Sequence, residues 1–193
     1  MNEGNDPRDP NQPPPQTEQL QHSSVAARVP DKVAQGVFST GVVVMEGPEE
    51  YVIDFIQGIT RPPRVAARVI VSPNVMGQFV GALRDNLSRY EQSFGPPKPL
   101  PQPPQPERRR SIQEMYEDLK MPDEVLTGAY ATTVMIGHSP SEFFMDFITR
   151  FFPHAAVSAR VYVAASQLPQ VLQALSAAHQ NRQNREKRPP EPN

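Results

Sequence analysis

The chain has 193 residues, a formal net charge of −2 and no cysteine. The lack of cysteine excludes disulfide frameworks, thiolate metal sites and cysteine catalysis, and the near-neutral charge gives no general attraction to nucleic acid or anionic membranes. No apolar run reaches the roughly 18–20 residues that span a bilayer, and the polar N-terminus is not typical of a signal peptide, so we expect a cytoplasmic protein that does not enter a membrane.

Prolines, 24 in all, are concentrated near the two ends of the chain and in its middle. Such segments favour extended conformations and offer little apolar surface to bury, so we expect them to be disordered. The predicted division is a disordered start at 1–28, a first repeat at 29–95, a proline-rich linker at 96–110, a short helix at 111–120, a second repeat at 121–181 and a disordered basic, proline-rich tail at 182–193.

An internal repeat relates the two halves of the chain. Residues 30–83 align with 122–175 at an offset of 92 without a gap, and nineteen of the 54 pairs are identical, where ordinary residue frequencies would give about three. Two copies are too few for a solenoid. The repeat therefore predicts a duplicated domain that folds as an internal pseudo-dimer.

The elements of the first copy follow from its composition. Strands are expected at 37–46, 50–57 and 65–71, which are rich in β-branched and aromatic residues. Ser72 and Pro73 then supply a helix N-cap and a first-turn proline, and an apolar stripe at helical spacing follows them. Each copy is thus predicted to be β-β-β-α, and the alternative for 50–57 is a short helix.

The second copy repeats this pattern, with a helix over roughly 167–185. The predicted fold class is α+β, with antiparallel sheet and helices. Both faces of strands two and three carry apolar residues, whereas a sheet with one wet face should alternate more regularly. We therefore expect each sheet to be covered on one face by its own helix and on the other by the sister copy or by another chain.

One acidic and one basic residue stand on the second face in each copy, Asp54 with Arg68 and Asp146 with Arg160. A charge among apolar groups is costly unless it is paired. The plain interpretation is a cross-strand salt bridge that fixes register, which makes these four the candidate structural or interaction residues. The alternative is a polar spot in a ligand pocket.

A short helix is predicted at 111–120, because Ser111 and Glu114 match a capping box and apolar residues follow at helical spacing. Ten residues are too few for a stable isolated helix. It must therefore dock, and the second copy's sheet is the simplest place, with a partner protein as the alternative.

No residue pattern points to catalysis. The four histidines lack the spacing of helical metal ligands, and phosphate-binding loops and nucleophile elbows are absent from the sequence. We expect no enzyme, no cofactor and no catalytic, cofactor-binding or metal residue. Basic residues gather in the linker and tail, where they could contact phosphates; these are Arg108, Arg109, Arg110, Arg182, Arg185, Lys187 and Arg188.

Three segments carry a family resemblance: HSPSEFFMDF at 138–147, ARVIVSP at 67–73, and the helix end with Tyr90-Glu91 and Phe94-Gly95. They resemble a prokaryotic family known as domain of unknown function 3467, whose members look like single-copy proteins. This chain would be a tandem version. The second copy lacks the Ser-Pro before its helix and the Tyr-Glu after it. The resemblance implies the fold unit and no known activity or ligand.

The leading functional hypothesis is a non-catalytic structural or protein-interaction module that oligomerises through sheet faces or edges, or binds a protein partner. The alternative is a nucleic-acid-associated protein that uses the basic linker and tail. A third hypothesis is a small-ligand binder or enzyme at the Asp/Arg pairs.

Overall fold

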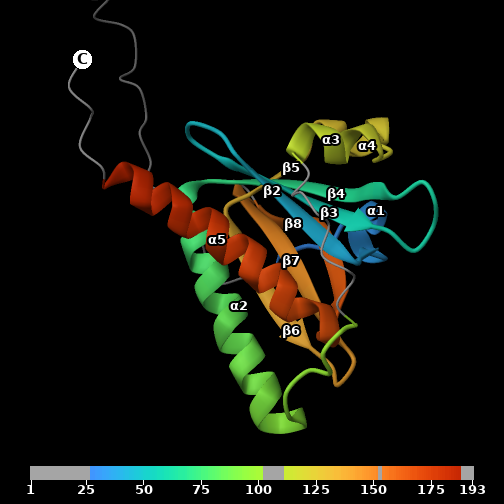
Figure 1. Ribbon diagram of the computed structural model, residues 1–193, viewed down its shortest axis with the longest axis vertical. Helices are drawn as coiled ribbons and strands as arrows, with labels where there is room; N and C mark the ends of the chain where they lie inside the picture. The colour runs from blue at the N-terminus through green and yellow to red at the C-terminus, as the bar shows by residue number, and fades with distance from the viewer. Residues whose placement is uncertain (1–26, 102–110, 152–153, 188–193) are drawn as a thin grey trace, which may run out of the picture.

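The computed structural model describes residues 27–101, 111–151 and 154–187. Disorder was predicted for segments that include residues 1–26, 102–110 and 188–193, and these residues lie outside the described ones. The elements in chain order are α1 (Asp31–Ala34), β1 (Val37–Ser39), β2 (Gly41–Glu46), β3 (Tyr51–Gln57), β4 (Arg64–Val71), α2 (Pro73–Phe94), α3 (Ile112–Glu117), α4 (Asp123–Leu126), β5 (Ala129–Ala131), β6 (Thr133–His138), β7 (Glu142–Phe151), β8 (His154–Ala164), the 3₁₀ turn η1 (Ala165–Gln167) and α5 (Leu168–Glu186) (Figure 1).

Two four-stranded sheets make up the β part of the described chain. Sheet A has the order β1-β8-β7-β6 and sheet B the order β2-β3-β4-β5. Within each copy the last three strands pair antiparallel. The α+β class and the pseudo-dimer of two related units are confirmed, and 50–57 is a strand rather than a helix.

The strand predicted at 37–46 is in fact two strands that lie in different sheets. β1 pairs parallel with β8 of the second copy, and its counterpart β5 pairs parallel with β4 of the first. The predicted strand is interrupted at Thr40, whose amide and hydroxyl both donate to the carbonyl of Ile56. Thr132 does the same with Ile148 in the other copy. Each sheet is therefore completed by a strand from the other copy.

The inner faces of both sheets and the two long helices form one hydrophobic core. At its centre the ring of Phe147 lies 5.5 Å from Phe55 and 5.4 Å from Phe79, measured between centroids. The main helix–sheet contacts run between copies, α2 with β6 and α5 with β2, and the two helices pack on each other (Figure 1). The expectation that each sheet is covered by its own helix was therefore wrong.

Short segments lie on the outer faces of the sheets. α1 contacts β8 of sheet A, while α4 contacts β4 of sheet B. The predicted helix at 111–120 is helical over the shorter span of α3, and it docks on sheet B, whose main strands belong to the first copy. The prediction that it docks on the second copy's sheet was wrong, because Tyr116 of α3 donates to Asp54 in the first copy's part of sheet B (Figure 1).

α5 continues to Glu186, beyond the predicted start of the tail at residue 182. The guanidinium of Arg182 donates to the carbonyls of Gly47 and Pro48 at 3.0 and 2.6 Å, and Arg185 pairs with Glu46. These contacts to the β2–β3 turn hold the end of the helix. Among the described residues, no helix combines the length and apolar character needed to cross a membrane.

Candidate functional site

The two Asp/Arg pairs lie on the outer sheet faces, where strands three and four of each copy run side by side. Asp54 is directly opposite Arg68, and its side chain is fully buried. Arg68 donates from Nε to Oδ1 and from Nη2 to Oδ2, both at 2.8 Å. The hydroxyl of Tyr116 in α3 also donates to Asp54. The sheet and the docked helix together thus satisfy the buried carboxylate.

The second copy repeats the arrangement. Arg160 donates from Nε and Nη2 to the two carboxylate oxygens of Asp146, both at 2.7 Å. The exposed fraction of the Asp146 side chain is 1%. Within the described segments no tyrosine takes the place that Tyr116 has at Asp54, so Arg160 alone supplies side-chain donors to this carboxylate.

Each arginine also holds a backbone carbonyl of the other copy. Nη1 of Arg68 donates to Leu126 at the end of α4 at 3.1 Å, and Nη1 of Arg160 donates to Ala34 at the end of α1 at 3.3 Å. The hydrogen bond to its aspartate raises the pKa of each arginine above its ordinary value. Both guanidinium groups are therefore fixed cations that join the exchanged segments to the sheet.

Two glycines bring these exchanged segments against the arginines. Gly36 and Gly128 follow α1 and α4 with φ of 65° and 73°, a region that glycine enters without steric cost. A Cβ at Gly36 would lie 2.8 Å from Cγ of Arg160, and one at Gly128 would lie 3.0 Å from Cγ of Arg68. The positions thus require glycine for both conformation and close approach.

A row of aromatic side chains crosses the outer face of sheet A. Phe38 of β1 is opposite Tyr162 of β8, which is opposite Phe144 of β7, which is opposite Gly137 of β6. The three rings line a hollow of about 550 Å³, called here the aromatic hollow. Its lining is Gln35, Gly36, Val37, Phe38, Ser139, Glu142, Phe144 and Tyr162.

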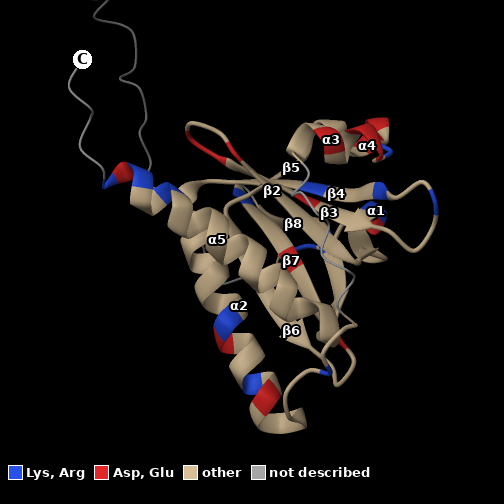
Figure 2. Cartoon of the chain, in the orientation of Figure 1, with Lys and Arg blue, Asp and Glu red and all other residues tan. Residues whose placement is uncertain are grey.

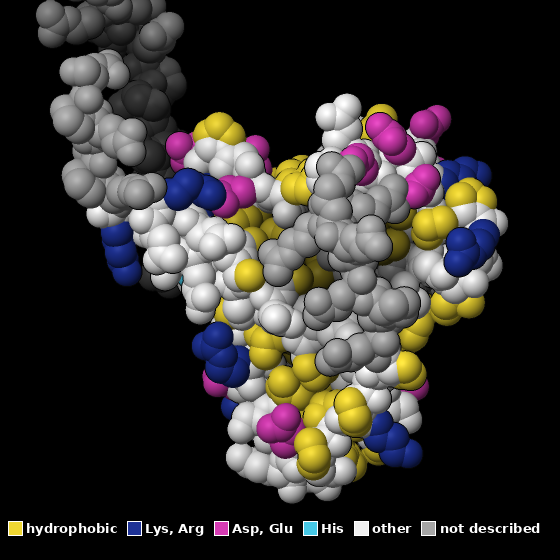
Figure 3. All heavy atoms as spheres, viewed as in Figure 1, with side chains coloured by type: hydrophobic (Ala, Val, Ile, Leu, Met, Phe, Trp, Pro, Cys, Tyr) yellow, Lys and Arg dark blue, Asp and Glu magenta, His cyan; other side chains and the backbone are white. Residues whose placement is uncertain are grey.

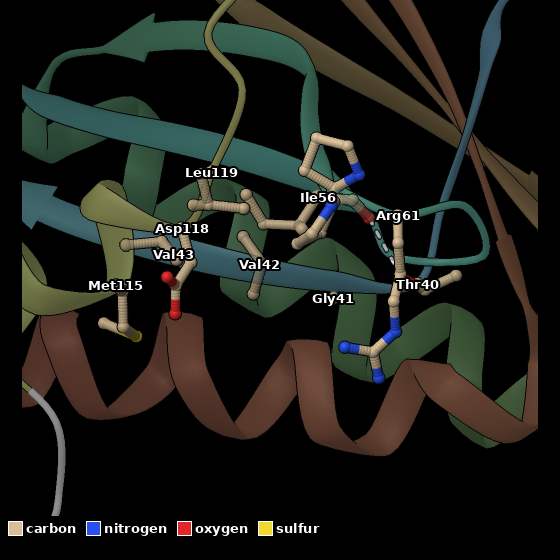
Figure 4. Close-up of a pocket in the computed structure, with 11 residues that line it drawn as sticks. Thr40, Gly41, Val42, Val43, Ile56, Arg61, Met115, Asp118 and Leu119 are labelled. Atoms are coloured by element: carbon tan, nitrogen blue, oxygen red, sulfur yellow. Dashed lines mark hydrogen bonds between the residues drawn. The ribbon is translucent and has the colours of Figure 1, made fainter.

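A second cavity, of about 680 Å³, lies between α3 and sheet B. Met115 and Leu119 from the α3 segment line it together with Val43 and Ile56 of the sheet, and Arg61 lies at the end opposite Met115 (Figure 4). This cleft is the edge of the α3 docking site rather than a closed ligand pocket.

Comparison with known protein families finds one family twice along the chain. It is described as a protein of unknown function (DUF3467), and the matches cover residues 4–99 and 101–186. The chain belongs to this family. It is a tandem duplication of the DUF3467 unit, as the internal repeat predicted. No curated protein matches the chain.

Charge is unevenly distributed over the paired DUF3467 units. Acidic side chains gather on α3 and α4 (Figures 2 and 3), and they are Glu114, Glu117, Asp118, Asp123 and Glu124. Of the basic residues singled out from the sequence, Arg108 to Arg110 and Arg188 lie outside the described residues. Arg182 contacts the β2–β3 turn and Arg185 pairs with Glu46 at the end of β2, so both are part of the folded structure.

The sequence identified the four residues of the Asp/Arg pairs, and the fold brings each pair together. It missed Tyr116, although a tyrosine on the apolar stripe of a docking helix needs a partner for its hydroxyl. It also missed the role of Gly36 and Gly128, which are equivalent positions in the two copies.

In the described part of the DUF3467 pair, no cluster of three or more His, Asp or Glu side chains could hold a metal ion.

Proposed function

We propose that this chain is a cytoplasmic, non-catalytic protein-interaction module that binds its partner through the outer face of sheet A. One observation carries this proposal. The two sheets are equivalent by internal symmetry, and α3 covers the outer face of sheet B, while no described helix like α3 covers the same region of sheet A.

On sheet B, α3 shows what this type of face accepts. Tyr116 reaches Asp54, and Met115 and Leu119 line the cleft with Val43. The equivalent of Val43 on sheet A is Met135, which is 51% exposed. An exposed methionine beside a buried ion pair is an adaptable apolar contact point, typical of binding surfaces.

The first copy's sequence lacks the two side chains through which α3 contacts sheet B. At the offset of 92, Ser23 and Ser24 stand where Met115 and Tyr116 stand in the second copy. Serine offers neither the apolar area nor the phenol that hold α3 on sheet B. The corresponding site on sheet A is therefore suited to a segment from another molecule.

The saturated ion pairs support a non-catalytic role. Each guanidinium of Arg68 and Arg160 donates to two carboxylate oxygens and one carbonyl, which leaves little capacity for a substrate. The nucleic-acid alternative is weaker, since Arg182 and Arg185 are used within the fold and the α3–α4 surface is acidic.

Site-specific photo-crosslinking in cells tests the proposal. A photoreactive amino acid at Met135 is expected to give a discrete adduct, and the same group at Ile59, an exposed residue of the β3–β4 loop, is expected to give none. An adduct of twice the chain mass would identify self-association. No adduct at Met135, or equal adduct yields at Met135 and Ile59, would overturn the proposal.

A separate binding measurement tests the nucleic-acid alternative. Binding of the chain to random RNA or DNA at low salt, lost when residues 188–193 are removed, would favour that alternative.

A further inference from the structure

We propose that the aromatic hollow on sheet A binds a proline-rich segment in the polyproline II conformation that carries a basic residue. This inference rests on the proposed function, because it names the class of partner for the same sheet face. The occupant belongs to another protein, and it is recognised through ring packing, exposed carbonyl groups and one charge.

The register of the sheet places three rings in one line. Directly opposite residues on neighbouring strands have Cβ atoms about 5 Å apart and share a face, so Phe38, Tyr162 and Phe144 form a continuous band. The band ends over Gly137, where a Cβ would overlap the ring of Phe144. The absence of a side chain at Gly137 gives that ring room to lie across the sheet.

The rings of this band remain available to a ligand. Phe38 is 40% exposed, and none of the ring–ring contacts between described residues joins two of these three rings. Phe144 and Tyr162 are half-buried, so each presents part of its ring to the hollow. Proline-rich ligands dock in aromatic-lined grooves of this kind, because their preformed helix loses little entropy on binding.

Hydrogen-bonding groups at the rim match such a ligand. A polyproline II helix makes no internal hydrogen bonds, so its carbonyl oxygens are free to accept. The amide of Gln35 and the hydroxyl of Tyr162 line the hollow and can donate to them.

Charge selects among possible ligands. Glu142 is the one charged residue that lines the aromatic hollow, and its carboxylate accepts a hydrogen bond from Ser139 at 2.5 Å. A carboxylate at the rim repels the phosphates of a nucleic acid strand and attracts a lysine or arginine. A basic proline-rich peptide therefore fits better than stacked nucleobases.

Sheet B shows that the band is not required by the fold. At the offset of 92, the positions of Tyr162 and Phe144 hold Ile70 and Val52 in the first copy. The same sheet face is thus built with aliphatic residues at these places. Substituting the aliphatic residues into sheet A should leave the fold intact while removing the band.

A peptide titration with the full chain tests the proposal. The probe is the fluorescein-labelled peptide PPKPLPQPPQP, copied from residues 96–106 of this chain, and the readout is fluorescence anisotropy. We expect saturable binding that weakens about tenfold or more in Tyr162→Ile, since a buried aromatic often carries much of the binding energy. We expect a similar loss when the lysine of the peptide is changed to glutamate.

Controls separate binding at the hollow from other effects. Tyr130→Ala on sheet B should leave the affinity unchanged, and thermal unfolding should show that Tyr162→Ile is folded. The titration is repeated on a chain with serine at Pro97, Pro99, Pro101, Pro103, Pro104 and Pro106 and with glutamate at Lys98, so that the chain's own linker cannot compete. If the peptide binds neither the parent chain nor the linker variant, the proposal is overturned.

Two further outcomes are distinct. Stronger binding of a labelled oligothymidine than of the peptide, also lost in Tyr162→Ile, would replace the proline-rich ligand by stacked bases. If the peptide fails to bind while the photoreactive group at Met135 still gives its adduct, this inference is wrong and the proposed function stands. If neither is seen, both are wrong.

Discussion

Arg68 in β4 donates a hydrogen bond to the carbonyl of Leu126, at the end of α4 in the other copy. The same guanidinium holds Asp54 in its own sheet, and Arg160 repeats the pattern with Ala34 and Asp146. Each arginine therefore links one copy's sheet to the segment that carries the exchanged strand of the other copy. The same two arginines therefore neutralise the buried aspartates and hold the segments that lead into the exchanged strands β1 and β5.

Removing one arginine should destabilise the whole fold. Arg68→Met leaves the fully buried Asp54 with Tyr116 as its remaining side-chain donor, and breaking a buried pair in this way costs about 3–5 kcal/mol. Arg160→Met should cost more, because among the described residues no tyrosine donates to Asp146. Urea unfolding measures both free energies.

The double variant Asp54→Leu with Arg68→Met is the matched control. It removes both charges, so the unpaired carboxylate disappears, and we expect it to be more stable than Arg68→Met alone. A free energy of unfolding for Arg68→Met within about 1 kcal/mol of the parent, the range of a surface ion pair, would show that the pair does not hold the copies together.

Tyr116→Phe should loosen α3 and give a specific dependence on pH. Losing a hydrogen bond to a charged group costs about 1.5–3 kcal/mol. Burial, with the hydrogen bond to Asp54, raises the pKa of Tyr116 above its ordinary value, so the folded state favours the protonated phenol. The stability that Tyr116 contributes is therefore fully present below about pH 10, the ordinary tyrosine pKa, and is lost as the pH rises further.

Urea unfolding of the parent and Tyr116→Phe at pH 8 and above pH 10 tests this dependence. The gap between the two free energies of unfolding should be constant below pH 10 and narrow above it. A gap that widens with rising pH would contradict the assignment of Tyr116 as the donor to Asp54.

Glycine substitutions should separate strained positions from open ones. Gly36→Ala places a Cβ 2.5 Å from Cε2 of Tyr162 at a positive φ, and the left-handed conformation alone costs an ordinary residue about 1–2 kcal/mol. Gly128→Ala meets its nearest atom at 3.0 Å and should cost less. Gly81→Ala, with nothing within 4 Å inside α2, should stabilise by about 0.5–1 kcal/mol. Equal thermal midpoints for all three would contradict this account.

Much of each repeat could be predicted from local patterns. Alternation with period two placed Asp54 and Arg68 on one face of neighbouring strands, and the register places them directly opposite each other. Helical spacing and the Ser72 cap located α2, whose N-cap side chain accepts from the amide of Val75. These features depend on residues close together in the sequence, so the sequence pattern is sufficient.

The strand exchange could not be predicted in this way. The residues of β1 and β2 are equally suited to either sheet. The interruption between these strands at Thr40 is marked by no proline, nor by a glycine present in both copies, since Gly41 aligns with Thr133. The hydrogen bonds that fix the break go to Ile56. The contact that holds the end of α5 likewise joins distant residues, since Gly47 stands 135 residues before Arg182. Such contacts arise from tertiary packing.

The exchange predicts that the first half of the chain is a dimer when it is expressed alone. In residues 1–101, β1 has no β8 to pair with and β4 has no β5, but β1 is the counterpart of β5 at the offset of 92. Two copies can therefore place β1 of each on β4 of the other and rebuild a shared core, which a single small unit could not close. Light scattering after size exclusion should give twice the fragment mass, and removal of residues 1–39 should abolish the folded dimer. A folded monomer of residues 1–101 would show that exchange is not needed to complete the sheets.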